Sequence, residues 1–213
     1  MNNTAFATPG PIAITVDVLY GNVRVIASDR TDTVVEIRPT DQSKRDDVRA
    51  ATHTQVDFSA GALTVKTPKG WRIYTPFSGN PSIEVVIQVP TGSQLKATAG
   101  MGVVQSSGEL GPCELEMSAG DITIERVHGS VTAKTGKGNI RIGEASRGVL
   151  ELETCMGELE VGISAGSTAR LENSTQNGTV HNQLTPADQE QDTVVVYARN
   201  SYGNIIIGHC TAA

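Results

Sequence analysis

Three aromatic side chains, Trp71, Tyr74 and Phe77, lie close together in a stretch of the sequence that also contains glycine and proline. Aromatic residues are scarce in this chain, which has one Trp, four Tyr and three Phe among 213 residues. Trp and Tyr combine a large apolar surface with a polar group, which suits the lining of a ligand cleft. We therefore predict that this segment lines a cleft for an apolar small-molecule substrate. The alternative is that it closes one end of the fold or packs along its side as additional core.

Four further candidates share one position in the sequence, directly before a glycine: Tyr20, Met101, Met156 and Tyr202. Large apolar residues at a turn are not needed to fill a core, so we predict that they contact the substrate. The hydroxyl groups of Tyr20, Tyr74 and Tyr202 are candidate hydrogen-bond donors to it. Such a cleft would speed a reaction by holding a flexible apolar substrate in a near-attack shape, which requires few ionisable groups. The sequence assigns no catalytic residue.

Other kinds of site find little support in the sequence. The HExxH and P-loop motifs are absent, and so is the GGxGxD repeat that binds calcium. The odd number and wide spacing of Cys113, Cys155 and Cys210 fit neither a disulfide framework nor a zinc site. Glu151 and Glu153 resemble a glycosidase pair, but similar pairs recur at alternate positions, as on a solvated strand face. We expect no metal and no cofactor.

A repeat centred on glycine positions these candidates. Alternate residues on both sides of each glycine are apolar or small, which is the pattern of strand, corner and strand with one buried face per strand. The unit around Gly178 fits worst, because Asn173 and Asn182 occupy two of its inward positions. The intervals are 18, 18 and 19 residues at first and longer afterwards, for Gly102, Gly120, Gly138, Gly157, Gly178 and Gly203.

Two architectures have this alternation. An antiparallel meander of hairpins accepts variable loop lengths, whereas nearly constant spacing with like residues at like positions indicates stacked, equivalent coils. We therefore predict an all-β fold, a parallel β-solenoid (β-helix) with coils of about 18–20 residues that is regular from residue 93 to 208. Stacking predicts two inward rows, Leu95/Cys113/Val131/Leu150 and Val104/Ile122/Ile140/Leu159.

Residues 1–92 are less regular, and we predict that they form irregular N-terminal coils of one domain that spans residues 1–213. Strand patterns occur at Thr33–Arg38 and Ser82–Val89. A short helix is predicted from Asp41 to Ala51, with Thr40 or Asp41 as its N-cap. We expect this helix to cap or flank the solenoid, whose open end needs covering.

The composition argues against several classes of partner. A net charge of −6 without a Lys/Arg run disfavours nucleic acid. No apolar run reaches the roughly 18 residues needed to cross a bilayer, so we expect no membrane insertion. Residues 1–11 lack the pattern of a secretory signal, which predicts a cytoplasmic protein. We expect a monomer or a homodimer, since an exposed terminal coil could pair with another.

Several segments together resemble a known family. They are Asn22–Asp32 (NVRVIASDRTD), Pro68–Trp71 (PKGW), Pro90–Ser93 (PTGS) and Ala99–Gly102 (AGMG), followed by repeated glycine corners. In this order they resemble the bacterial putative-adhesin family of β-strand-repeat proteins, of unknown function and common in actinobacteria. The resemblance covers nearly the whole chain and implies a β-solenoid. It supplies no catalytic residues.

The same resemblance implies an activity. Some similar proteins accompany polyether and tetronate polyketide pathways, where they resemble ring-forming catalysts of the cyclase or Diels–Alderase type. It therefore implies a cofactor-independent enzyme that folds an apolar, polyketide-like substrate in a cleft walled by Trp71, Tyr74 and Phe77. The alternative is a non-catalytic scaffold or adhesin-like binding protein that uses the flat faces of the solenoid.

Overall fold

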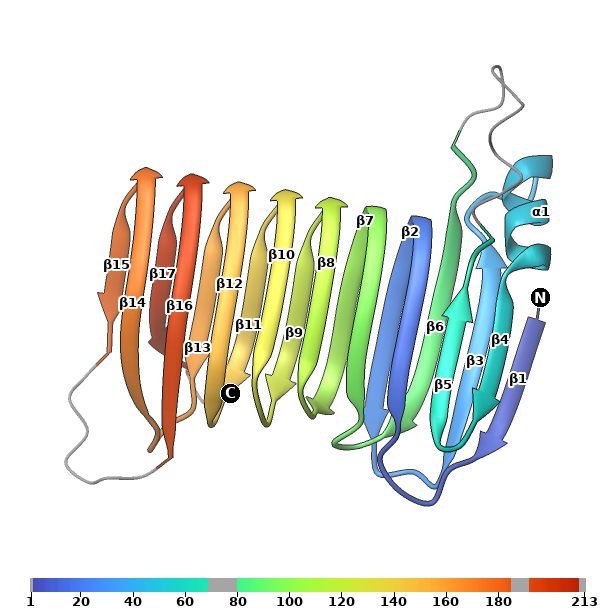
Figure 1. Cartoon of the computed structure of the whole chain (residues 1–213), viewed down its shortest axis with the longest axis horizontal. Coiled ribbons are helices and arrows are strands. Elements are labelled where there is room, and N and C mark those ends of the chain that lie inside the picture. The colour runs from blue at the N-terminus through green and yellow to red at the C-terminus, as the bar shows by residue number, and fades with distance from the viewer. Residues whose placement is uncertain (1, 69–79, 185–191, 211–213) are drawn as a thin grey trace.

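The computed structural model describes residues 2–68, 80–184 and 192–210, and it shows an elongated stack of coils with the single described helix at one end (Figure 1). The stack is a β-solenoid, as the glycine spacing predicts. Each regular coil has two strands that meet at a glycine corner. These pairs are β8 (Cys113–Ala119) with β9 (Ile122–Val127), β10 (Val131–Lys137) with β11 (Ile140–Ala145), β12 (Gly148–Met156) with β13 (Leu159–Ile163), β14 (Thr168–Asn177) with β15 (Val180–Gln183), and β16 (Thr193–Tyr202) with β17 (Ile205–His209).

Two longer strands, β2 (Ala13–Ser28) and β7 (Gln94–Leu110), pass through the corner without a break. Their first halves join the first strand of every coil in one parallel layer, the front sheet, in the order β2, β7, β8, β10, β12, β16 and β14. Their second halves join the second strands in the back sheet, in the order β2, β7, β9, β11, β13, β17 and β15.

The register confirms both predicted inward rows. Leu95 pairs with Cys113, which pairs with Val131 and then Leu150 along the front sheet. The back sheet aligns Val104, Ile122, Ile140 and Leu159 in the same way. All eight side chains are buried, and one apolar core continues from Ile12 to Ile207. Aliphatic ladders therefore fill the thin space between the two sheets.

The corners require glycine because successive coils approach very closely there. Gly138 has a φ of +144°, and a Cβ atom on it would lie 2.1 Å from the carbonyl oxygen of Gly120 in the preceding coil. Neither the backbone angle nor the contact accommodates a larger residue. The regular spacing of glycine in the sequence therefore follows from the close stacking of the coils.

The order of coils in space departs from their order in the chain near the C-terminus. The final coil, β16–β17, lies between β12–β13 and β14–β15 and pairs in parallel with both (Figure 1). The coil around Gly178 is therefore the end of the stack. Its inward Asn173 and Asn182 are exposed, which explains why this unit fits the apolar template worst. A polar end coil also disfavours association of the open end of the stack with other chains.

The N-terminal part covers the opposite end of the stack. β5 (Ala62–Lys66) and β6 (Ile83–Pro90) continue the two sheets in parallel with β2. Antiparallel strands then complete the edges, with β4 (Gln55–Ser59) on β5, β3 (Asp32–Pro39) on β6 and β1 (Asn2–Ala7) on β3. The predicted strands at Thr33–Arg38 and Ser82–Val89 correspond to β3 and β6.

The helix α1 (Arg45–His53) lies against β3 and β6, so its predicted flanking position is confirmed. Its predicted start is wrong, because the N-cap is Lys44 and not Thr40 or Asp41. The Asp41 carboxylate instead accepts hydrogen bonds from the backbone and hydroxyl of Ser43, at 2.9 and 2.6 Å, in a turn before the helix. Buried Asp47 accepts bonds from the backbone N–H groups of Asp41 and Ser82, which fixes the helix to β6.

Candidate functional site

The structure places four of the predicted substrate-contacting residues in one row along the edge where the corner glycines lie. Tyr20 is the register partner of Met101, and Met156 is the partner of Tyr202. Between these two pairs the row continues through Ala119 and Lys137. Trp71, Tyr74 and Phe77 lie outside the described residues, so the aromatic cleft that they were predicted to wall stays a prediction.

These residues form a surface feature, which we call the apolar ridge: Tyr20, Met101, Met156 and Tyr202. Relative exposure is 50% for Met101, 51% for Met156 and 55% for Tyr202, while Tyr20 is half-buried. Val103, beside Met101 on the same edge, is 38% exposed. Large apolar side chains gathered along one edge are a common mark of an interaction surface. The ridge residues lie on an edge of the solenoid, and none of them lines either of the two hollows described next.

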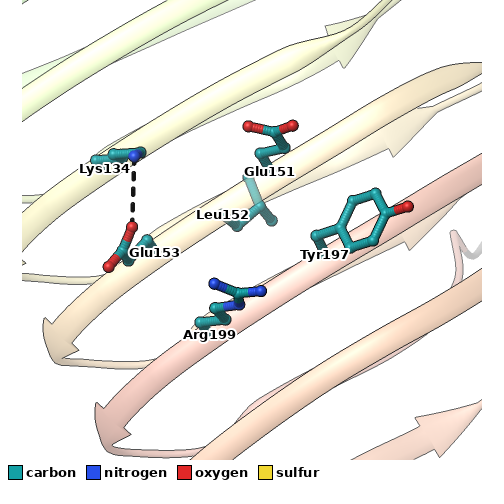
Figure 2. A pocket seen from close by; sticks show the side chains of 6 residues that line it. All are labelled: Lys134, Glu151, Leu152, Glu153, Tyr197 and Arg199. Carbon is teal, nitrogen blue, oxygen red and sulfur yellow. Dashed lines mark ion pairs between the residues drawn. The ribbon is translucent and has the colours of Figure 1, made fainter.

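A shallow hollow opens on the outer surface of the front sheet (Figure 2). Its volume is about 320 Å³, at the lower end of the roughly 300–1,000 Å³ typical of ligand pockets. The residues around it come from three neighbouring strands, namely Lys134 on β10, Glu151, Leu152 and Glu153 on β12, and Tyr197 and Arg199 on β16. All except buried Leu152 occupy outward positions, because alternate residues of a strand face opposite sides of the sheet.

The strand register determines which groups meet in this hollow. Glu151 is the partner of Tyr197, and Glu153 is the partner of both Arg199 and Lys134. The Lys134 Nζ atom lies 3.5 Å from Oε2 of Glu153, and both side chains are about half exposed, so this ion pair contributes little stability. With the other described residues, Glu151 and Arg199 form no side-chain hydrogen bond or ion pair. One carboxylate and one guanidinium therefore remain available to a ligand beside a tyrosine ring.

A second hollow of about 580 Å³ lies farther along the same sheet, where its lining includes Thr15, Lys96, Glu114 and Thr132. Lys96 and Glu114 form an ion pair of 2.8 Å across it. The two hollows are in line, because one row of paired residues passes through both: Thr15, Lys96, Glu114, Thr132, Glu151 and Tyr197. At about 4.8 Å per strand, this row is about 24 Å long. We call it the front track.

Sequence reasoning assigned Glu151 and Glu153 to a solvated strand face, and the structure places them there. It missed Tyr197, although an aromatic residue at an outward position of an alternating strand is a usable signal. The histidines assigned to the surface include His181 and His128, and both are exposed. Within the described ranges no three His, Cys, Asp or Glu side chains gather as a metal site would require.

The three cysteines are all free. Cys113 is buried in the front-sheet row, and burial raises the pKa of its thiol to about 12. Cys155 is exposed one residue before Met156, and the thiol of Cys210 donates to the carbonyl of Ile163 at 3.1 Å. In the part of the chain that the structure describes, no helix has both the length and the apolar character needed to cross a bilayer.

Comparison with known proteins identifies the fold. No protein-family model matches the chain, and no curated protein matches its sequence. A solved structure of a putative cell adhesion protein from Clostridium sporogenes is similar at a TM-score of 0.54 and 12% identity, over 98% of this chain and 99% of that one. A putative adhesin from Bacteroides fragilis gives a TM-score of 0.51 and 12% identity, over 97% and 96%. The chain shares the fold of these two solved structures.

This likeness extends over essentially the full length of both chains. At 12% identity it shows the fold alone and assigns no residue a role. The solved structures are described as a putative cell adhesion protein and a putative adhesin, and neither description names an enzyme or a substrate. They provide no evidence for the cyclase activity or the actinobacterial type implied by the sequence resemblance.

Proposed function

We propose that this protein is a non-catalytic, adhesin-like binding protein that uses the outer surface of its solenoid, and that the front track binds a neutral glycan. The observation that carries the proposal is the hollow at Tyr197, where an aromatic ring lies beside the carboxylate of Glu151 and the guanidinium of Arg199 on an exposed sheet. The shared fold with adhesion proteins supports the binding alternative better than the ring-forming enzyme. The ring-forming hypothesis stays a prediction, because the segment on which it depends lies outside the described residues.

The tyrosine suits a sugar because its ring offers a flat apolar surface and its hydroxyl offers a polar group. A pyranose ring has an apolar C–H face that stacks on such a surface, and its hydroxyl groups both donate and accept. Glu151 on the neighbouring strand supplies acceptor oxygens, and Arg199, two residues farther along β16, supplies donors. The hollow therefore combines the three kinds of contact that a sugar needs.

The balance of charge favours a neutral ligand. The hollow is lined by two carboxylates, Glu151 and Glu153, and by two cations, Lys134 and Arg199. A strongly charged ligand would find as many repelling groups as attracting ones, which removes the electrostatic complementarity that such ligands require. The alignment of the two hollows along about 24 Å favours a chain of several sugar units over a single one.

The test is a direct binding measurement with neutral oligosaccharides. Maltohexaose, cellohexaose and chitohexaose would be titrated into the full chain and followed by saturation-transfer NMR and calorimetry. We expect one of them to bind weakly, with a dissociation constant on the order of 0.1–1 mM. Changing Tyr197 to Ala should weaken this binding at least about tenfold, whereas Tyr197→Phe should retain most of it.

Tyr202→Ala is the matched control, since Tyr202 is on the same strand but on the ridge and not in the hollow. It should leave oligosaccharide binding unchanged. The proposal is overturned if none of the three oligosaccharides binds at about 10 mM, roughly ten times the upper end of the expected range of dissociation constants. It is also overturned if Tyr197→Ala and Tyr202→Ala bind equally well.

A further inference from the structure

The row that contains the apolar ridge has a symmetry that its strand register reveals. The row ends with Asn177 of the end coil, and the part of the row before that residue contains, from coil to coil, Tyr20, Met101, Ala119, Lys137, Met156 and Tyr202. Read in the opposite direction it again begins with tyrosine and methionine and ends with methionine and tyrosine. Only the central pair, Ala119 and Lys137, changes place. A surface with this property can pair with a reversed copy of itself.

The spacing makes this symmetry geometric as well as chemical. Neighbouring strands are about 4.8 Å apart, so the six positions lie at equal steps along roughly 24 Å. A two-fold axis that passes between Ala119 and Lys137, perpendicular to the sheets, brings two such edges together with their rows antiparallel. Each interface of two-fold symmetry requires one surface that is complementary to itself, and the ridge satisfies this requirement.

We propose that the apolar ridge is the docking surface for a second copy of this chain, in an antiparallel homodimer. Tyr20 then contacts the partner's Tyr202, and Met101 contacts the partner's Met156. Both contacts occur twice by symmetry and cover the exposed apolar side chains of the ridge. This inference goes beyond the proposed glycan site, because the hollow lies on the front sheet and remains open in such a dimer.

The centre of the row is complementary in size and charge. Ala119 is small, so it leaves room for the long side chain of the partner's Lys137. Asp121, two residues after Ala119 on the same edge, offers a carboxylate near that ammonium group. Asp121 already accepts a backbone hydrogen bond from Asn139, which holds its side chain at the edge. The polar centre therefore fixes the register of the dimer, while the apolar ends supply contact area.

The ridge is narrow, and this limits the strength of the dimer. An edge two strands thick and roughly 24 Å long buries less than the approximately 800 Å² per partner of a standard interface. We therefore expect a weak dimer, with a dissociation constant on the order of 10–100 μM. The polar end coil, β14–β15, takes no part in it.

Sedimentation velocity of the full chain between micromolar and millimolar concentration tests the proposal. The wild-type chain should shift from monomer to dimer, and Met101→Lys with Met156→Lys should remain monomeric over the same range. Val48→Lys is the control, because Val48 is 41% exposed on α1, away from the ridge. A wild-type chain that stays monomeric at millimolar concentration, or that dimerises equally well with both lysines, overturns the proposal.

Cysteine cross-linking then tests the antiparallel register. In a Cys155→Ser background, Met101→Cys combined with Met156→Cys should give a covalent dimer under mild oxidation. Neither single variant should do so, because each cysteine lies about 14 Å from its own symmetry mate, three strand spacings away. Cross-linking by a single variant would overturn the antiparallel arrangement.

Discussion

The backbone N–H of Asn139 donates a 2.7 Å hydrogen bond to Oδ1 of Asp121, which occupies the same corner position one coil earlier. The Asn139 side chain repeats this contact in the next coil, where its Oδ1 accepts from the backbone N–H of Glu158 at 2.8 Å. Asn22 and Val103 form the equivalent bond at 3.1 Å. The corners are therefore connected by a ladder of side chain-to-backbone hydrogen bonds that runs beside the stacked glycines.

Removing one rung of this ladder should lower the stability of the whole stack. Asn139→Ala leaves the backbone N–H of Glu158 without its side-chain acceptor, and we expect a loss of about 1 kcal/mol in the free energy of unfolding. Urea denaturation followed by circular dichroism measures this change. Asn139→Asp keeps an acceptor oxygen and should remain close to wild type. If the alanine variant is as stable as wild type, the ladder has no energetic role.

The corner glycines should tolerate substitution far less well. Gly138→Ala places a Cβ 2.1 Å from the carbonyl oxygen of Gly120 at a φ of +144°, so both backbone strain and a steric clash oppose folding. We expect a loss of about 3 kcal/mol or more, measured by thermal and urea unfolding. Gly10→Ala is the control, because a Cβ there meets nothing within 4 Å. Equal stability of the two variants would contradict the stacking argument.

The sequence predicts most of the fold because each coil repeats the same physical requirements. The spacing of the glycines predicts where the backbones of successive coils approach closely. The alternation of apolar and polar residues predicts which side chains enter the core, as Leu95 and Cys113 illustrate. The order of the last two coils could not be predicted from spacing, because both have strands that fit beside β12. The polar inward residues Asn173 and Asn182 were the available signal, and they are explained by a coil that lies at the end of the stack.

The position of the final coil between β12–β13 and β14–β15 also determines which side chains are neighbours in the hollow and on the apolar ridge. Because β16 lies beside β12, Tyr197 is next to Glu151 and Tyr202 is next to Met156. In chain order, β14 would occupy that place and would bring Glu172 and Asn177 there instead. The ridge residues could be selected from the sequence, since each precedes a corner glycine. The hollow and the symmetry of the row could not, because they depend on contacts between strands that are distant in the chain.

A buried hydroxyl without a partner should make the core less stable than it could be. Ser106 is 2% exposed in the inward row between Val25 and Ile124, and its Oγ has no hydrogen-bond partner among the described residues. We expect Ser106→Ala to raise the free energy of unfolding by about 1 kcal/mol, because it removes an unsatisfied polar atom. Differential scanning calorimetry would show this as a higher Tm.

Thr154 provides the opposite case for comparison. Its buried hydroxyl donates to the carbonyl of Gly138 at 2.9 Å, so Thr154→Ala should lower stability by about 1 kcal/mol or more. The two alanine variants thus have expected effects of opposite sign. A Ser106→Ala variant that is destabilised to the same extent as Thr154→Ala would show that the Ser106 hydroxyl is satisfied in solution.

Cys113 should lower the free energy of unfolding of the protein at alkaline pH. Burial raises the pKa of its thiol from 9.0 to about 12, so the folded state keeps the proton while the unfolded state releases it. Above pH 9.0 the unfolded chain therefore binds fewer protons than the folded chain, and the free energy of unfolding falls as pH rises. The stability that the folded state gains by keeping the Cys113 thiol protonated is fully present below pH 9.0 and is lost between pH 9.0 and about 12. Urea denaturation at pH 7, 9 and 10.5 would follow it.

Cys113→Ala isolates this effect from other groups that titrate in the same range. The variant should be less stable at neutral pH, because it leaves a small cavity, but its stability should fall less steeply above pH 9.0. Thiol labelling at pH 8 gives an independent measurement. Exposed Cys155 should react rapidly with a disulfide reagent, and Cys113 should react only as fast as the protein unfolds. Rapid labelling of a Cys155→Ser variant at Cys113 would show that this row of the core opens without global unfolding.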